Sequence, residues 1–214
     1  MLSLSTDRLL AFAVTAFVVI VIPGPSVLFV VGRALASGRR VAVLTVVGNA
    51  LGEYVQVLAV AFGVGALAEQ SVAAFTALKL LGGAYLVYLG VKTFRHRRSL
   101  AAALAGMVQA GSDRRSFLEG FTVGATNPKT VVFLAAILPQ FVDRAAGDVV
   151  AQILVLGLVF AAIAVVSDSI WALAAGSFRA WFARSPRRLE LVGGTGGLAI
   201  VAVGAALIVS GRKN

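Results

Sequence analysis

The chain has 214 residues, a formal net charge of +10 and no cysteine; 59% of its residues are apolar and only 13% are charged. A soluble domain of this size could not bury so much apolar surface, a disordered chain would carry more charge, and the lack of cysteine excludes disulfides and thiolate metal sites. With a mean hydropathy of +0.95, the composition predicts an integral membrane protein.

Six apolar stretches are long enough to cross a bilayer, whose apolar core of about 30 Å takes roughly 20 residues of helix. Their long unbroken runs lack the alternation of a membrane β-barrel strand. We therefore expect an all-α bundle of six transmembrane helices that forms one domain over residues 1–214. The expected spans are Leu9–Val31, Val41–Leu67, Val72–Phe94, Phe117–Phe141, Val149–Gly176 and Leu189–Ser210.

The first stretch has an alternative interpretation as a cleaved signal peptide, because Ala34-Leu35-Ala36 resembles a cleavage site. The apolar run before this tripeptide is too long for such a peptide and contains Pro23-Gly24-Pro25. We therefore expect the first stretch to remain in the protein as a membrane span.

Basic residues gather in the loops that follow the first, third and fifth spans. These loops hold thirteen Lys and Arg residues, whereas four lie on the other side. Because basic residues stay on the cytoplasmic side of short loops, we expect both termini outside the cytoplasm, in the plasma (inner) membrane of a bacterium. Topology then explains the net charge, with contact to anionic membrane lipids as a secondary contribution and without nucleic acid as a partner. The longest loop, residues 95–116, also holds the apolar run Leu100–Val108, which is long enough only for a surface helix.

Prolines interrupt the first and fourth spans at matching places, in Pro23-Gly24-Pro25-Ser26 and in Asn127-Pro128-Lys129-Thr130. Proline breaks or kinks a helix, and lipid tolerates a break only where the freed backbone groups line a cavity or find protein partners. Matching breaks in two three-span halves, 1–95 and 116–214, predict an inverted repeat, which is typical of secondary transporters that bind substrate between broken helices. The simpler alternative is that each proline only kinks a packed helix.

Six short motifs are distributed over essentially the whole chain. They are Ile22-Pro23-Gly24-Pro25-Ser26, Gly48-Asn49-Ala50-Leu51-Gly52, Leu78–Gly90, Gly120-Phe121, Asn127-Pro128-Lys129 and Pro139-Gln140-Phe141. Together they resemble the lysine exporter and homoserine/threonine resistance (LysE/RhtB) superfamily. The resemblance implies a six-helix bacterial exporter of amino acids or related small metabolites that uses the proton gradient. Members of this superfamily differ in substrate, so the resemblance does not fix the cargo.

Polar side chains lie deep in the second and fourth spans, where an ionisable group costs about 2.5–3.5 kcal/mol. In each span they recur at i, i+4 and i+7, which places them on one helix face. Glu53 and Lys129 lie at the same depth, about 18 Å from the inner end, so we expect an ion pair with either a structural or a transport role. The two polar faces are Asn49, Glu53 and Gln56, and Thr122, Thr126 and Lys129.

Asp168 lies in the fifth span between two serines and has no basic residue near it in the sequence. A carboxylic acid can take up and release a proton, so we expect Asp168, with Glu53 as the second candidate, to bind an ammonium group or couple transport to protons. Lys79 lies close enough to the outer end of its span to reach the membrane interface, and we expect a structural or gating role for it. Glu119 lies two residues inside the inner end of its span, and we expect it at the interface.

Glycines recur at a spacing of four in Gly48-x-x-x-Gly52 and Gly120-x-x-x-Gly124. This spacing lets membrane helices approach closely. This spacing suits contacts within one chain and contacts between two copies equally well, so it does not decide between a monomer and a homodimer.

These features predict an exporter with alternating access for a substrate that carries an ammonium and a carboxylate group. Asp168 or Glu53 would hold the ammonium, while Lys129 and backbone N–H groups beside Pro25 and Pro128 would hold the carboxylate, because helix N-termini favour anions. The candidate substrate-binding residues are Pro23, Gly24, Pro25, Asn49, Glu53, Asn127, Pro128, Lys129 and Asp168.

Other functions fit the sequence less well. We expect no enzyme, cofactor or bound metal, because His96 is the single histidine and neither H-E-x-x-H nor G-x-S-x-G occurs. A passive channel would need a continuous polar lining. The main alternative is a metal-ion or other cation exporter of the same superfamily with Glu53 and Asp168 as oxygen ligands, although a lysine near two acids favours a zwitterion.

Overall fold

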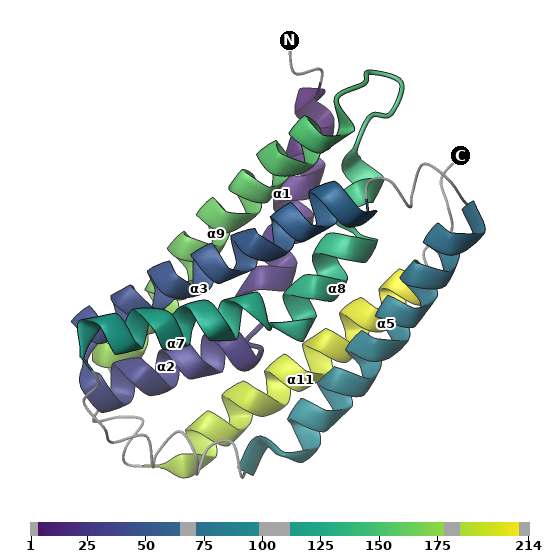
Figure 1. Ribbon diagram of the computed structural model, residues 1–214. Coiled ribbons are helices and arrows are strands. Elements are labelled where there is room, and N and C mark those ends of the chain that lie inside the picture. The colour runs from purple at the N-terminus through teal and green to yellow at the C-terminus, as the bar shows by residue number, and fades with distance from the viewer. Residues whose placement is uncertain (1–3, 65–71, 99–111, 178–184, 210–214) are drawn as a thin grey trace.

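The structure is a computed structural model that describes residues 4–64, 72–98, 112–177 and 185–209, and this part of the chain is helical without strands (Figure 1). The expected all-helical fold is confirmed for these residues, whereas the expected surface helix Leu100–Val108 lies outside them. A π-helical turn, η1 (Val60–Val64), extends the third helix, and a 3-10 turn, η2 (Leu138–Phe141), follows α8. The α-helices are α1 (Thr6–Val21), α2 (Pro25–Ser37), α3 (Arg39–Ala59), α5 (Val72–Arg95), α7 (Asp113–Ala125), α8 (Pro128–Ala136), α9 (Val149–Ser177) and α11 (Pro186–Val209).

Both predicted helix breaks are present. The axes of α1 and α2 are bent by 55°, and those of α7 and α8 by 45°. Pro25 and Pro128 begin the second helix of each pair, where the missing proline N–H costs no helical hydrogen bond. The second break also has a side-chain cap, because Asn127 Oδ1 accepts a hydrogen bond of 3.2 Å from the backbone N–H of Lys129.

Several helices have the length and composition of membrane spans. Three pass this test alone, namely Arg39–Gly63, Val149–Ser177 and Glu190–Val209, and each bent pair passes as one unit, which gives up to five spans among the described residues. Their outer faces expose large apolar side chains throughout the bundle, such as those of Leu51 and Val166. The expected third span corresponds to α5, which does not pass the test, so the count of six goes beyond what length and composition establish.

Helix pairs join the first half of the chain to the second half (Figure 1). In the first half, α3 packs against α7 and α8 of the second half. In the second half, α9 packs against α1 and α2 of the first half, and α11 packs against α5.

Buried aromatic rings fill the space where α1, α8 and α9 meet. Phe12 and Phe133 are fully buried, with ring centroids 6.0 Å apart. Phe133 stacks on Phe160 at 5.3 Å, and Phe12 contacts Phe141 edge-on at 5.4 Å. This aromatic cluster separates the centre of the bundle from the end at which α1 and α9 begin.

Glycines allow α3 and α7 to pack backbone against backbone. A methyl group on Gly52 would collide with the carbonyl of Phe121, and one on Gly124 would collide with the carbonyl of Asn49. The other glycine of each G-x-x-x-G motif has the same kind of contact. The two motifs therefore pack against each other within one chain.

This packing predicts that Gly124→Ala destabilises the protein by about 1–3 kcal/mol, since an added methyl group overpacks a closed contact. The measurement is the melting temperature of detergent-solubilised protein. Gly63→Ala is the matched control, because a Cβ there would meet nothing within 4 Å. Equal melting temperatures for the two variants would contradict the proposed close packing.

Candidate functional site

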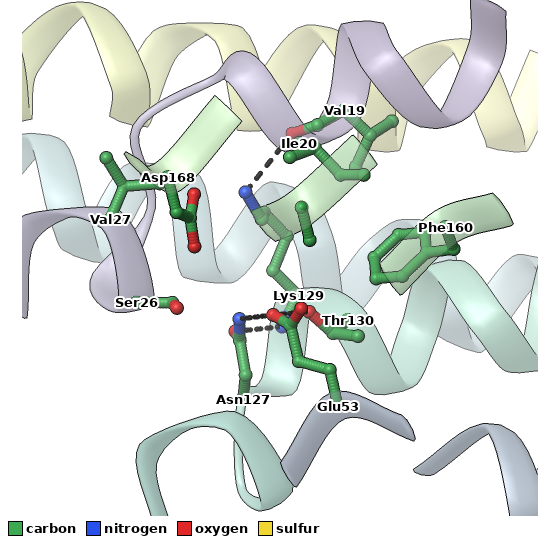
Figure 2. Close-up of a pocket in the computed structure, with 11 residues that line it drawn as sticks. Val19, Ile20, Ser26, Val27, Glu53, Asn127, Lys129, Thr130, Phe160 and Asp168 are labelled. Carbon is green, nitrogen blue, oxygen red and sulfur yellow. Dashed lines mark hydrogen bonds between the residues drawn. The ribbon is translucent and has the colours of Figure 1, made fainter. Parts of the chain in front are cut away.

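A small buried cavity lies at the centre of the bundle, between the two helix breaks (Figure 2). It has room for about one water molecule, so the structure represents a closed form of the site. Its lining combines apolar side chains with two acids and one lysine. The lining residues are Val19, Ile20, Ser26, Val27, Glu53, Asn127, Lys129, Thr130, Phe160, Ala164 and Asp168.

Glu53 projects from α3 toward the second break. Its side chain is buried, and its Oε1 atom accepts hydrogen bonds from Asn127 Nδ2 at 3.2 Å and from Thr130 Oγ1 at 3.0 Å (Figure 2). The second oxygen, Oε2, is buried without a hydrogen-bond partner in the described part of the chain. One oxygen of the carboxylate thus holds the break in place, and the other makes no hydrogen bond within the described residues.

Asp168 projects from α9 and is linked to the first break by a short chain of hydrogen bonds. Asn49 Nδ2 donates to Asp168 Oδ2 at 3.3 Å, and Ser26 Oγ donates to Asn49 Oδ1 at 2.7 Å. Asp168 is buried, and its Oδ1 atom has no hydrogen-bond partner among the residues that the structure describes. Asp168 therefore repeats the arrangement of Glu53, with one oxygen held and one open.

Lys129 reaches from the second break to the first. Its amino group donates to the backbone carbonyls of Val19 at 3.1 Å and Ile22 at 3.0 Å, at the end of α1. A cation is favoured at a helix C-terminus, and Gly24 leaves space for the side chain, because a Cβ there would lie 3.3 Å from the Lys129 amino group. The expected ion pair is wrong in this form, since no salt bridge within the described ranges joins Lys129 to Glu53.

Gln56 donates hydrogen bonds to backbone carbonyls at the second break, as Lys129 does at the first. Its Nε2 group donates to the backbone carbonyls of Gly124 at 2.8 Å, Ala125 at 3.0 Å and Asn127 at 3.3 Å. The carbonyls of Gly124 and Asn127 also accept backbone N–H groups, from Asn127 at 3.2 Å and from Val131 at 3.0 Å, whereas that of Ala125, at the end of α7, has no backbone donor among the described residues. The sequence placed Gln56 on a polar face but did not indicate this role.

The polar face predicted for the second span is confirmed, because Asn49, Glu53 and Gln56 are all buried. The face predicted for the fourth span is wrong, since Thr122 and Thr126 are exposed whereas Lys129 is buried. Counting i, i+4 and i+7 assumes one continuous helix. Here α7 ends before Lys129, and the bend turns the later residues toward the bundle.

The remaining candidate residues divide into those that line the cavity and those that shape the breaks. Glu53, Asn127, Lys129 and Asp168 line it, and Asn49 reaches it through Asp168. Ser26 and Thr130 also line it and were not among the candidates, although Ser26 directly follows Pro25 and Thr130 lies two residues after Pro128. The residues that shape the breaks without lining the cavity are Pro23, Gly24, Pro25 and Pro128.

An ion pair joins α2 to α7 where α2 ends and α7 begins. Arg33 of α2 pairs with Glu119 of α7, and Arg115 Nε donates to the same carboxylate at 2.8 Å. Glu119 is therefore part of a contact between the two halves of the chain. Of the aromatic cluster, Phe160 lines the cavity, whereas Arg33 and Glu119 lie outside its lining.

The role of Gln56 predicts that Gln56→Leu lowers stability by about 1–3 kcal/mol, because it removes the hydrogen bonds of Gln56 and leaves the carbonyl of Ala125 without a donor among the described residues. Gln140→Leu is the matched control, since Gln140 is exposed and its side chain hydrogen-bonds to Ala136 of its own turn. Melting temperatures in detergent compare the two variants. A fall of the same size in both would contradict the capping role.

Comparison with known proteins places this site in a family. The profile of the LysE type translocator family matches residues 17–211. An uncharacterized membrane protein of Vibrio cholerae is 37% identical over 180 residues, which cover 83% of this chain and 84% of that protein. The homoserine/homoserine lactone efflux protein of Salmonella typhimurium is 31% identical over 202 residues, or 94% of this chain and 96% of that protein.

A more distant relative, the leucine efflux protein of an Enterobacter species, is 27% identical over 200 residues and 92% of each chain. No solved structure matches the chain. The family profile, the membrane-protein relatives and the apolar helices agree with one another. The chain is therefore a multi-pass membrane protein that belongs to the LysE type translocator family.

Proposed function

We propose that the protein is a secondary active exporter of amino acids or closely related small metabolites in the inner membrane of a bacterium. The observation that carries the proposal is the pair of open carboxylate oxygens, Glu53 Oε2 and Asp168 Oδ1, in one cavity between two broken helices. Relatives named homoserine/homoserine lactone efflux protein and leucine efflux protein support this class of substrate.

An ammonium group fits the two open oxygens. Leaving a buried acceptor unsatisfied costs about 1–3 kcal/mol, and more for a charged group. The ammonium of an amino acid has three N–H donors, and hydrogen bonds between two charged groups are stronger than neutral ones. Glu53 and Asp168 would share this ammonium, with Asn49, Asn127 and the two hydroxyl side chains holding the acids in position.

Lys129 is the group in the cavity that suits the substrate carboxylate. Two of its three donors are used by Val19 and Ile22, which leaves one for a carboxylate oxygen. The backbone N–H of Lys129 is already bonded to Asn127, so the amino group rather than this N–H would make the contact.

Three sets of helix contacts support a bundle of six spans built as an inverted repeat, with α5 as the third span. The contacts of α3 with α7 and α8 correspond to those of α9 with α1 and α2, and α5 packs against α11. Lys79 and Lys92 lie toward the two ends of α5, from where long basic side chains can reach the membrane interface. The ends of α2, α5 and α9 lie together at one end of the molecule (Figure 1), where basic residues are concentrated. The positive-inside rule then assigns this end to the cytoplasm and both termini to the other side.

Transport requires the closed cavity to open toward each side in turn. Separation of Arg33 from Glu119 would open it to the cytoplasm and admit the substrate. Movement of the aromatic cluster around Phe133 would open it to the outside. A proton that binds Asp168 or Glu53 from the outside would displace the ammonium group, and its release into the cytoplasm would reset the exporter.

Loss of either carboxylate is expected to reduce export by at least about tenfold, because a hydrogen bond to a charged group contributes about 1.5–3 kcal/mol and 1.4 kcal/mol is a factor of ten. The variants are Asp168→Asn and Glu53→Gln, and the matched controls are Asp143→Asn and Glu190→Gln, which lie outside the cavity. Efflux is measured from cells preloaded with amino acids as dipeptides. If both cavity variants are inserted in the membrane and export amino acids at the wild-type rate, the proposed substrate site is refuted.

Proton coupling predicts that a protonophore abolishes the efflux that depends on this protein. The same preloaded cells, with and without the chain, provide the measurement. Efflux that continues unchanged in the presence of the protonophore would contradict proton coupling, whereas the proposal that the protein is an exporter would still hold. Efflux of a metal cation from these cells, without efflux of any amino acid, would favour the alternative of a cation exporter. In that exporter Glu53 and Asp168 would be oxygen ligands of the cation.

A further inference from the structure

A second pocket lies between the end of α5 and the start of α11, at the end of the molecule where basic residues are concentrated. Its volume is about 830 Å³, part of which is open to the surroundings, and Phe94, Arg97, Arg187, Leu191 and Leu198 are among its lining residues. None of these residues lines the central cavity. The pocket therefore has no assigned role in transport.

Arg97 is held in place within this pocket. Its Nη1 group donates to the backbone carbonyl of Phe94 at 2.7 Å, and its guanidinium lies 4.3 Å from the centre of the Phe94 ring. Gly194 gives the side chain room, because a Cβ there would lie 3.1 Å from Arg97 Cδ. An arginine has five donors in a fixed plane, so a fixed Arg97 presents further donors to a ligand.

The charge of the pocket is positive. Arg187 on the first turn of α11 is exposed and lines the same space. The acid of the pocket, Glu190, forms an ion pair of 3.5 Å with Arg98. Two arginines that face one space suit a phosphate group, which a guanidinium can bind through two parallel hydrogen bonds.

The rest of the pocket is apolar and follows α11 away from the basic end. The side chains of Leu191 and Leu198 are 66% and 56% exposed, and they stand two turns apart on one face of the helix. A free anion would leave this surface uncovered, whereas an acyl chain would cover it. Charge at one end and an apolar track leading from it match the two parts of a phospholipid.

We propose that this pocket binds an anionic phospholipid of the cytoplasmic leaflet. Arg97 and Arg187 hold the phosphate, and an acyl chain lies along Leu191 and Leu198. Basic pockets between membrane helices on this side of the bilayer are suited to acidic headgroups. The lipid joins α5 to α11, so its binding stabilises this helix pair independently of the transported substrate.

Native mass spectrometry of the full chain in nonionic detergent, titrated with phosphatidylglycerol or phosphatidylcholine of the same acyl chains, tests the proposal. Wild-type protein is expected to retain phosphatidylglycerol preferentially. The double variant R97Q/R187Q is expected to bind it about tenfold more weakly, through loss of charge-assisted hydrogen bonds. R39Q/R40Q is the matched control, because it removes the same charge at the same end and leaves the pocket intact. R187Q alone, at an exposed position, serves if the double variant fails to fold.

Equal retention of the two lipids by wild-type protein would overturn the proposal, as would equal weakening in the pocket variant and the control. A third titration uses inorganic phosphate as a competitor. Displacement of phosphatidylglycerol by millimolar phosphate would show a site for free anions and would also overturn it. Wild-type efflux in R97Q/R187Q together with lost lipid binding would leave the exporter proposal untouched.

Discussion

The constraint on which this structure depends is the need to satisfy backbone groups where two helices break inside a membrane. Each break frees carbonyls at the end of its first helix, and no water is available within lipid to bind them. Gln56 donates to those at the second break, and Lys129 donates to those at the first. Because Lys129 itself belongs to the second break, the two halves of the chain meet at one shared contact in the centre of the bundle.

The same arrangement explains why the centre can serve as a binding site. The groups that hold the breaks use only one oxygen of each buried acid, so Glu53 and Asp168 each keep one oxygen for a ligand. Lys129 keeps one donor in the same way. The closed cavity has room for about one water molecule, so the proposed transport of an amino acid requires the halves to separate. The ion pairs of Arg33 with Glu119 and of Arg40 with Asp113 join the two halves of the chain at the end where α7 begins.

The sequence predicted the features that depend on local pattern. Apolar runs gave the helices, prolines gave both breaks, and the spacing of Asn49, Glu53 and Gln56 gave the polar face of α3. The sequence could not predict the contacts that depend on how the helices are placed relative to one another. Bends of 55° and 45° carry Lys129 to the carbonyls of Val19 and Ile22 and away from Glu53, and they separate Thr122 and Thr126 from the site. Equal depth in two straight helices therefore did not predict which side chains meet.

The central claim is that Glu53 and Asp168 bind the ammonium group of an amino acid. Counterflow in proteoliposomes, with an exported amino acid as the tracer, tests it through competition by the unlabelled amino acid, its methyl ester and its N-acetyl derivative. The ester keeps the ammonium group, whereas acetylation removes it at little cost in size. The account predicts that the ester competes and that the N-acetyl derivative competes at least about tenfold more weakly, since it loses a charge-assisted contact. Equal competition by the N-acetyl derivative and the parent amino acid would contradict it.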